Sequence, residues 1–181
     1  MPRIEFNAPA TILYAFAAVA ATLAVQVAPA AVPGIHGPVS LDPGFVISLF
    51  TWTLPHADAS HLIGNFVTIL LVGPILEKHY GTGRMFGIYA LGSAVVGLVH
   101  CLLAPGYVLI GASGTAFLCI TMGGLISGRA SGRIPLTFAI VAVLYLGREV
   151  IDMLGHDDVS QTAHLAGGVL GTLLGLRRTR R

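Results

Sequence analysis

The chain has 181 residues, of which 55% are hydrophobic and only 10% are charged, with a formal net charge of +2. A soluble domain carries about 25% charged residues, so this chain has too few polar side chains to cover a surface that faces water. The composition excludes an ordinary soluble domain and indicates a protein whose solvent is the lipid bilayer. The small net charge gives no support to nucleic-acid binding.

Six apolar stretches follow one another along the chain, and each approaches the roughly 20 residues that a helix needs to cross the hydrocarbon core. We therefore expect an all-α fold, a polytopic transmembrane bundle of six helices, in a single domain over residues 1–181. The expected spans are residues 8–32, 60–76, 85–103, 108–127, 134–154 and 162–176.

The first stretch could instead be a cleaved signal peptide, because Arg3 precedes it and the small residues Ala30 and Ala31 stand near its end. Its apolar run exceeds about 20 residues, whereas the apolar core of a signal peptide has about 7–15. We therefore interpret it as a retained helix.

The longest connection, residues 33–59, is rich in proline, glycine and histidine and contains an apolar patch over residues 45–52. This patch is too short to span the bilayer. We expect it to lie at the membrane interface, with Trp52 at the level of the headgroups.

The basic residues divide unequally between the two sides that six spans define. One side holds the N-terminus, the loops after spans two and four, and the C-terminus; of the ten Lys and Arg residues, Arg148 alone falls elsewhere, which leaves nine on this side. The positive-inside rule predicts that both termini are cytoplasmic. We expect an integral, multi-pass protein of the plasma membrane. The opposite loops carry the aspartates Asp42, Asp58, Asp157 and Asp158.

Four polar residues stand near the outer ends of three spans. His61 and Asn65 fall in the first two turns of span two, Ser113 about five residues into span four, and His164 in the first turn of span six. A rise of about 1.5 Å per residue places all four within roughly 10 Å of one level. Because polar groups inside a membrane are costly, we expect them to face one shared cavity.

These residue types suit acyl transfer. A serine hydroxyl becomes nucleophilic when a base takes its proton, and a histidine such as His164 titrates in the right range. Asn65, His61 and a backbone N–H can donate to an oxyanion, and the glycines around the serine, Gly111 among them, let a substrate backbone approach closely. The two aspartates before His164 are expected in the solvated loop, so a Ser–His dyad is favoured over a triad.

Four motifs carry a family resemblance over about residues 54–176. They are His56-Ala-Asp-Ala-Ser-His61-Leu-Ile-Gly-Asn65, Gly73-Pro-Ile-Leu-Glu77-Lys-His-Tyr-Gly81, Gly111-Ala-Ser113-Gly114 and Ala163-His164-Leu-Ala-Gly167-Gly-Val-Leu-Gly171. Gly-x-Ser-Gly alone is a weak signal, but four motifs in order on the expected helices are specific. The chain resembles the rhomboid family of intramembrane serine proteases.

The resemblance implies a core of six helices in which Ser113 is the nucleophile and His164 the general base. It implies that His61, Asn65 and the backbone N–H of Ser113 stabilise the oxyanion, and that His56 supports the site.

The same resemblance implies that Phe117 packs on the catalytic histidine, and that Gly167 and Gly171 let span six press against span four. One departure concerns the loop after span one, where many relatives have a Trp-Arg pair and this chain has Trp52 followed by Thr53. It weakens expectations about the detailed structure of that loop.

Simpler explanations exist for each residue. Ser113 could be a packing serine, His164 a buried histidine with a structural hydrogen bond, and His61 with Asn65, which share a helix face, a local polar pair. His56, His61 and His164 could in principle hold zinc, but the His-Glu-x-x-His spacing of a helical metalloprotease is missing.

Other polar groups are expected to be structural. We expect Glu77, near the inner end of span two, to partner a helix N-terminus or a nearby arginine, and Arg148 to pair with Asp152 one turn away. Cys101 and Cys119 lie in apolar segments, which argues against a disulfide framework.

The resulting hypothesis is a serine endopeptidase that cuts transmembrane segments of other membrane proteins, with no metal or cofactor and with no prediction of oligomeric state. Two other classes stay open. One is a catalytically silent rhomboid-like protein that binds membrane clients. The other is a small transporter or channel, which would favour charged residues near the midplane or inverted repeats.

Overall fold

The computed structural model describes residues 4–28, 34–131, 133, 135–141, 143–144 and 158–177. Within these residues the fold is a bundle of helices, and the one piece of β-structure is a single antiparallel bridge between Ile35 and Leu109. This confirms the all-α expectation. The helices are α1 (Pro9–Val27), α2 (Pro43–Thr51), α3 (Ala59–Tyr80), α4 (Thr82–Leu103), α5 (Ser113–Ser131) and α7 (Asp158–Leu176).

Three of these helices, α1, α3 and α4, are long and apolar enough to cross a membrane. The helices α3 and α4 each have 22 residues, which at about 1.5 Å per residue matches the roughly 30 Å hydrocarbon core. Helix α5 adds a shorter apolar stretch, Ser113–Ile126. The chain is therefore an integral membrane protein that crosses the bilayer several times.

The expected spans correspond in order to these helices, but several boundaries are wrong. Helix α1 ends at Val27 and not at residue 32, and α3 continues to Tyr80 and not only to residue 76. Helix α5 begins at Ser113 rather than near residue 108, because the preceding chain is extended and pairs with the first loop: Leu109 and Ile35 exchange two backbone hydrogen bonds of 2.8 and 2.9 Å. Ser113 is consequently the first residue of its helix. Helix α7 begins at Asp158, so His164 lies in its second turn and not in its first. Most of the predicted fifth span, with the Arg148–Asp152 pair, lies outside the described residues.

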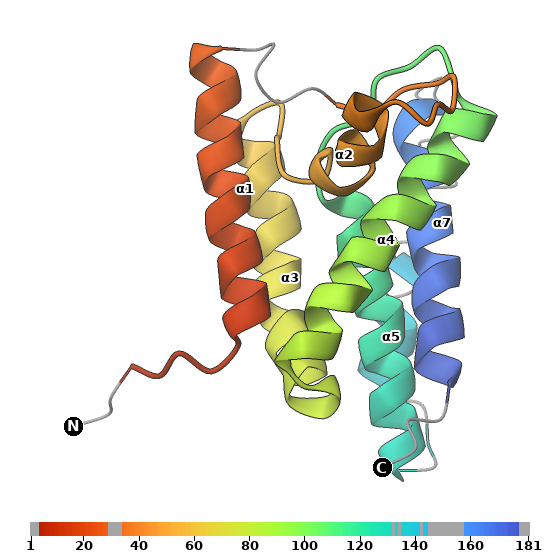
Figure 1. Cartoon of the computed structure of the whole chain (residues 1–181). Coiled ribbons are helices and arrows are strands. Elements are labelled where there is room, and N and C mark those ends of the chain that lie inside the picture. The colour runs from red at the N-terminus through yellow and green to blue at the C-terminus, as the bar shows by residue number, and fades with distance from the viewer. Residues whose placement is uncertain are drawn as a thin grey trace.

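Helix α5 runs through the middle of the bundle and packs against α7, α3 and α4 (Figure 1). Glycines of α7 set its distance from α5. A Cβ atom added to Gly167 would lie 3.1 Å from the Cα of Gly114, and one added to Gly171 would lie 2.8 Å from the Cα of Leu118. The prediction that these two glycines let the last span press against the fourth is confirmed.

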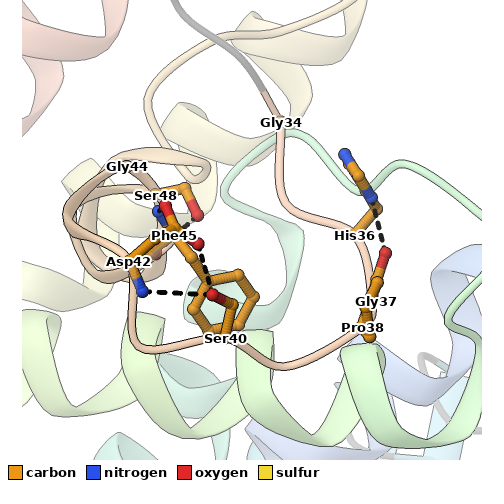
Figure 2. Close-up of a pocket in the computed structure, with 9 residues that line it drawn as sticks. All are labelled: Gly34, His36, Gly37, Pro38, Ser40, Asp42, Gly44, Phe45 and Ser48. Carbon is orange, nitrogen blue, oxygen red and sulfur yellow. Dashed lines mark hydrogen bonds between the residues drawn. The ribbon is translucent and has the colours of Figure 1, made fainter.

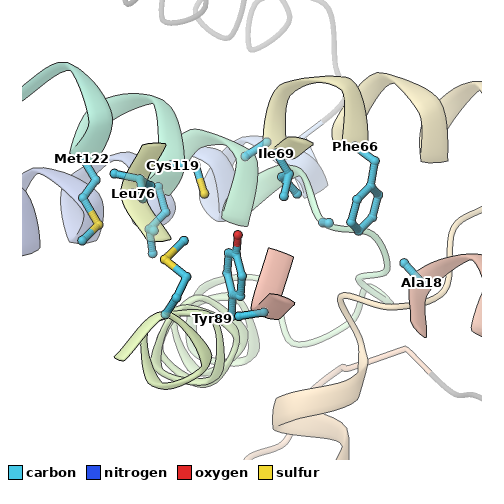
Figure 3. Close-up of a cluster of buried hydrophobic side chains, with 12 residues drawn as sticks. Ala18, Phe66, Ile69, Leu76, Tyr89, Cys119 and Met122 are labelled. Atoms are coloured by element: carbon cyan, nitrogen blue, oxygen red, sulfur yellow. The ribbon is translucent and has the colours of Figure 1, made fainter. Parts of the chain in front are cut away.

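A buried cluster joins α1, α3, α4 and α5, with Tyr89 directed between Ile69 and Cys119 (Figure 3). The ring of Tyr14 lies 4.8 Å from that of Tyr89 and 5.3 Å from that of Phe66, measured between centroids. Close aromatic packing of this kind holds α1 to its two neighbours. The thiols of Cys119 and of Cys101 are both free and buried.

Glu77 of α3 also binds α1, at the start of that helix. Its buried carboxylate accepts hydrogen bonds from the backbone N–H of Ala10, at 2.8 Å, from the N–H of Thr11, at 3.0 Å, and from the Thr11 hydroxyl, at 2.8 Å. These N–H groups belong to the first turn of α1, which has no intrahelical acceptor for them. Of the two partners expected for Glu77, the structure supports the helix N-terminus.

The loop between α1 and α3 folds over the end of the bundle where α5 begins (Figure 1). Its apolar patch forms α2, whose first turn is capped by Asp42 through a 2.9 Å bond from the N–H of Phe45. Trp52 is not at the interface with lipid as expected. Its side chain is fully buried, and its Nε1–H donates to the carbonyl of Ser93 at 3.1 Å. Its indole also fills the space beside Gly97, so this tryptophan anchors the loop to α4.

Candidate active site

Ser113 is the first residue of α5 and follows a sharp change in backbone direction at Gly111. Gly111 has a φ of +102°, a conformation that L side chains rarely adopt, and it follows the short segment in which Leu109 pairs with Ile35. In the run from residue 111 to residue 120, Ser113 is the one residue that is partly exposed. The turn therefore presents a single hydroxyl from an otherwise buried stretch.

Two hydrogen bonds fix this turn to the loop that precedes α3. The N–H of Gly111 donates to the carbonyl of Trp52 at 3.1 Å. The N–H of Ala112 donates to Nε2 of His56, also at 3.1 Å. His56 is fully buried, and its Nδ1–H donates to the carbonyl of Leu54 at 3.0 Å. His56 therefore holds the backbone beside Ser113 in place.

The two bonds also define the charge state of His56. Because Nε2 accepts a proton donor and Nδ1 donates, the ring is the neutral Nδ1–H tautomer. Burial is the main cause that lowers the pKa of His56, to about 4. Both nitrogens are occupied, which leaves none for a metal ion. Among the described residues there is no group of three or more His, Cys, Asp or Glu side chains that could hold one.

His61, in the first turn of α3, packs against the same backbone turn. A Cβ atom added to Gly111 would lie only 2.7 Å from Cε1 of His61 and 3.0 Å from its Nε2. Asp58 caps α3 by accepting a 2.8 Å bond from the N–H of His61, and the His56 and His61 rings meet edge to face at 5.0 Å. His61 is half-buried and near enough to His164 for the two rings to interact electrostatically.

Asn65 lies one turn further along α3, on the face that carries His61. It is buried, and within the described part of the chain its Nδ2 has no hydrogen-bond acceptor. A buried amide N–H₂ without an acceptor is costly. An amide in this state is suited to donate to an anion that is present only part of the time. The first N–H groups of α5, including that of Ser113, offer the same kind of donor.

His164 enters the site from α7. Its ring stacks on Phe117 of α5, with centroids 4.7 Å apart and planes only 9° from parallel. The backbones of the two helices meet at the same level, because a Cβ atom added to Gly114 would lie 3.0 Å from the carbonyl oxygen of Ala163. Gly114 directly follows Ser113 in the chain, and Ala163 directly precedes His164. The expected packing of Phe117 on the histidine is confirmed.

Sequence reasoning missed Gln161. This residue is 2% exposed, and its Nε2 is buried without an acceptor within the described residues. It precedes His164 by three positions, so both lie on one face of α7. The spacing was visible in the sequence, but a single glutamine shortly after two aspartates gave no reason to place it inside the bundle.

A pocket of about 380 Å³ lies in the loop around α2, apart from these residues (Figure 2). Within it His36 Nδ1 bonds the carbonyl of Gly37 at 2.7 Å, and the hydroxyl of Ser40 donates to the Asp42 carboxylate. The bond from Ser40 is the main cause that lowers the pKa of Asp42, followed by the bond from Phe45. These bonds tie the loop to itself, and none of the predicted site residues lines the pocket.

Residues 43–181 also match a known protein family. The family model described as "Rhomboid domain" matches residues 43–181. The chain belongs to the rhomboid family. The matched rhomboid region begins at α2 and contains every predicted site residue, namely His56, His61, Asn65, Gly111, Ser113 and His164.

Individual rhomboid proteins give the same result. The chain is similar to rhomboid protease GlpG of Serratia proteamaculans, with 29% identity over 128 residues, or 69% of this chain and 45% of that protein. It is similar to rhomboid-related protein 1 of Caenorhabditis elegans, with 31% identity over 130 residues, 66% of this chain and 36% of that protein. The rhomboid chain described here thus spans less than half the length of these two relatives.

Proposed function

We propose that this rhomboid protein is a serine endopeptidase that hydrolyses peptide bonds in or near transmembrane segments of other proteins. Ser113 is the nucleophile and His164 is the general base. The observation that carries the proposal is the meeting of α5 and α7 beside these two residues, through the contact of Gly114 with Ala163 and the stacking of Phe117 on His164.

In the first step His164 takes the proton of the Ser113 hydroxyl while Oγ attacks the scissile carbonyl carbon. The carbonyl π bond opens, and the oxygen becomes an oxyanion. The imidazolium of His164 then gives its proton to the leaving amine, which releases one product and leaves an acyl ester on Ser113. Water attacks this ester by the same route and regenerates the hydroxyl.

The oxyanion needs donors that are in place before it forms. The N–H of Ser113 stands at the positive end of the α5 dipole, and the Nδ2 of Asn65 is buried without another acceptor within the described residues. His61, which lies against Gly111, is the third donor. His56 and Gly111 support the site by holding the turn, and they do not contact the reacting atoms.

The substrate class follows from the surroundings of the site. Ser113 lies at the end of a helix in a membrane bundle, so a peptide that reaches it comes from another membrane-embedded segment. That segment has to expose its backbone, because helical carbonyl groups in lipid are bonded within the helix. The unequal charge distribution supports an orientation with both termini in the cytoplasm of a plasma membrane, and the residues involved supply the whole reaction without metal or cofactor.

The test compares the full-length protein in detergent with two variants, Ser113→Ala and His164→Ala. A fluorophosphonate should label the wild type and should not label Ser113→Ala. A transmembrane reporter should be cut by the wild type and left intact by both variants. Ser60→Ala is the matched control, because Ser60 is exposed on α3, and it should be labelled and active.

Equal labelling and equal cleavage by all four proteins would remove the protease assignment. Binding of the reporter without any cleavage or labelling in the wild type would favour the silent, client-binding protein. Solute flux through liposomes that persists in Ser113→Ala would favour a transporter.

A further inference from the structure

A second cleft lies at the opposite end of the bundle from Ser113, where α3 ends, α4 begins and α7 ends. It encloses about 430 Å³, which is in the range of small-molecule pockets. Its lining residues are Tyr80, Arg84, Gly87, Ile88, Leu91, Met122, Leu174 and Arg177. None of them takes part in the proposed hydrolysis.

The mouth of this cleft is positively charged. Arg84 is the third residue of α4, Arg177 follows the last residue of α7, and both side chains are exposed. Guanidinium groups bind phosphate through paired, charge-assisted hydrogen bonds. Tyr80, the last residue of α3, adds a hydroxyl to the same wall. The three residues come from three different helices, so the bundle itself brings them together.

The acidic residue closest along α3 does not neutralise this charge. Glu77 precedes Tyr80 by three positions, but its carboxylate accepts hydrogen bonds from Ala10 and Thr11 at the start of α1. Its negative charge is therefore directed toward a helix N-terminus and away from the two arginines.

The wall of the cleft becomes apolar with depth. Arg84, Ile88 and Leu91 follow one another along one face of α4, and seven residues of helix descend about 10 Å. Leu174 of α7 and the buried Met122 of α5 complete this wall. Gly87 leaves open space there, since a Cβ atom added to it would meet nothing within 4 Å.

A charged mouth above an apolar wall, between helices that cross a bilayer, matches one kind of ligand. A soluble anion would leave the apolar wall unused. A packed protein helix would have to remove two guanidinium groups from water, which is costly. Basic pockets between transmembrane helices suit anionic lipid headgroups. We propose that the cleft binds an anionic phospholipid of the leaflet on the side of the chain termini, with its phosphate between Arg84 and Arg177 and an acyl chain along Ile88, Leu91 and Leu174.

The experiment titrates phosphatidylglycerol into the full-length protein in neutral detergent and follows bound lipid by native mass spectrometry and stability by thermal unfolding. Phosphatidylcholine with the same acyl chains and inorganic phosphate are the comparison ligands. We expect phosphatidylglycerol to bind and to raise the unfolding temperature, with an affinity at least about tenfold above that of phosphatidylcholine, the effect of about 1.4 kcal/mol of differential binding.

Three variants separate the parts of the proposal. Arg84→Gln with Arg177→Gln should remove the preference for phosphatidylglycerol, whereas Lys78→Gln, which removes an exposed charge at the end of α3 outside the cleft, should keep it. Gly87→Phe retains both arginines but fills the apolar wall, and it should weaken lipid binding without changing the response to phosphate.

Equal binding of the two phospholipids by the wild type would overturn the proposal, as would a double variant that still prefers phosphatidylglycerol. Stabilisation by inorganic phosphate that equals that of the lipid, with no effect of Gly87→Phe, would reduce the cleft to a simple anion site and would also overturn it. The variant Ser113→Ala should bind the lipid like the wild type, because the two sites lie at opposite ends of the bundle.

Discussion

Nε2 of His56 accepts a hydrogen bond of 3.1 Å from the backbone N–H of Ala112, 56 residues further along the chain. This bond joins the loop before α3 to the residue that precedes Ser113, and His56 is fixed in turn by the carbonyl of Leu54. The His56 side chain thus holds the backbone segment that places Ser113.

Replacing His56 should therefore loosen the turn at Ala112. In His56→Phe the N–H of Ala112 loses its acceptor while the volume stays similar, and we expect a loss of about 1–3 kcal/mol of stability. His56→Asn retains one donor and one acceptor and should lose less. Thermal unfolding in detergent measures both. Equal stability of wild type and His56→Phe would show that the bond contributes nothing.

His56 should also make stability depend on pH. Its pKa is about 4 in the fold and about 6.5 in an unfolded chain, so below pH 6.5 the unfolded state binds a proton that the folded state does not. Stability is complete above pH 6.5 and decreases as the pH falls toward 4. We expect a loss of up to about 3 kcal/mol over this interval, at roughly 1.4 kcal/mol for each pH unit between the two pKa values. Unfolding curves of wild type and His56→Asn at several pH values isolate this contribution, and identical slopes would contradict it.

Two adjacent glycines of α7 should respond differently to the same substitution. A Cβ atom on Gly167 would press into the backbone of Gly114, whereas one on Gly168 would meet its nearest neighbour, a methyl group of Thr121, at an ordinary 3.8 Å. We expect Gly167→Ala to cost about 1–3 kcal/mol and Gly168→Ala to be nearly neutral. Unfolding in detergent provides the comparison. A Gly167→Ala protein as stable as Gly168→Ala would mean that α5 and α7 are not in close contact.

Removal of the Glu77 carboxylate should release the start of α1. Glu77→Ala leaves the N–H groups of Ala10 and Thr11 without their acceptor, at an expected cost of about 1–3 kcal/mol, and Glu77→Gln should cost less because one acceptor oxygen remains. Limited proteolysis near residues 4–10 should be faster in Glu77→Ala. Lys78→Ala changes the exposed neighbour and should behave as wild type.

Phe117 should affect the rate of the proposed hydrolysis rather than substrate binding. The ring stacks on His164, and loss of an aromatic contact worth about 1 kcal/mol corresponds to roughly a fivefold decrease in kcat. We expect this decrease in Phe117→Leu with little change in KM, and a smaller one in Phe117→Tyr, which keeps the ring. A change in KM alone would show that Phe117 does not position the histidine.

Hydropathy alone predicted the existence of α1, α3 and α4 and roughly where each begins, because each is a long apolar run. It failed at the start of α5, where Val108, Leu109 and Ile110 are as apolar as a helix, but Leu109 pairs with Ile35 of the first loop instead. A pairing between segments 74 residues apart leaves no trace in local composition. The positive φ of Gly111 marks the true boundary, and a glycine was the only local sign of it.

The polar residues of the site could be chosen from sequence because each stands out within an apolar helix. The part played by His56 could be named only through the family resemblance, since its acceptor role depends on the path of the backbone at Ala112. Trp52 was misjudged for the same reason. An aromatic residue in a loop is often interfacial, and the carbonyl of Ser93 that accepts its N–H lies on another helix.

In the proposed protease, the contact of Gly114 with Gly167 and Ala163 also limits how a peptide can reach Ser113. Helices whose main chains already touch cannot slide or separate without losing the shape that matches them, so the close packing of α5 against α7 fixes Ser113 and His164 relative to each other. Space for an incoming peptide has to come from the movement of other elements, whose main chains are not in such close contact. In the proposed protease, the alignment of Ser113 with His164 and the entry of a substrate would then depend on separate parts of the molecule, so that a substitution could slow entry while the two residues stay in place.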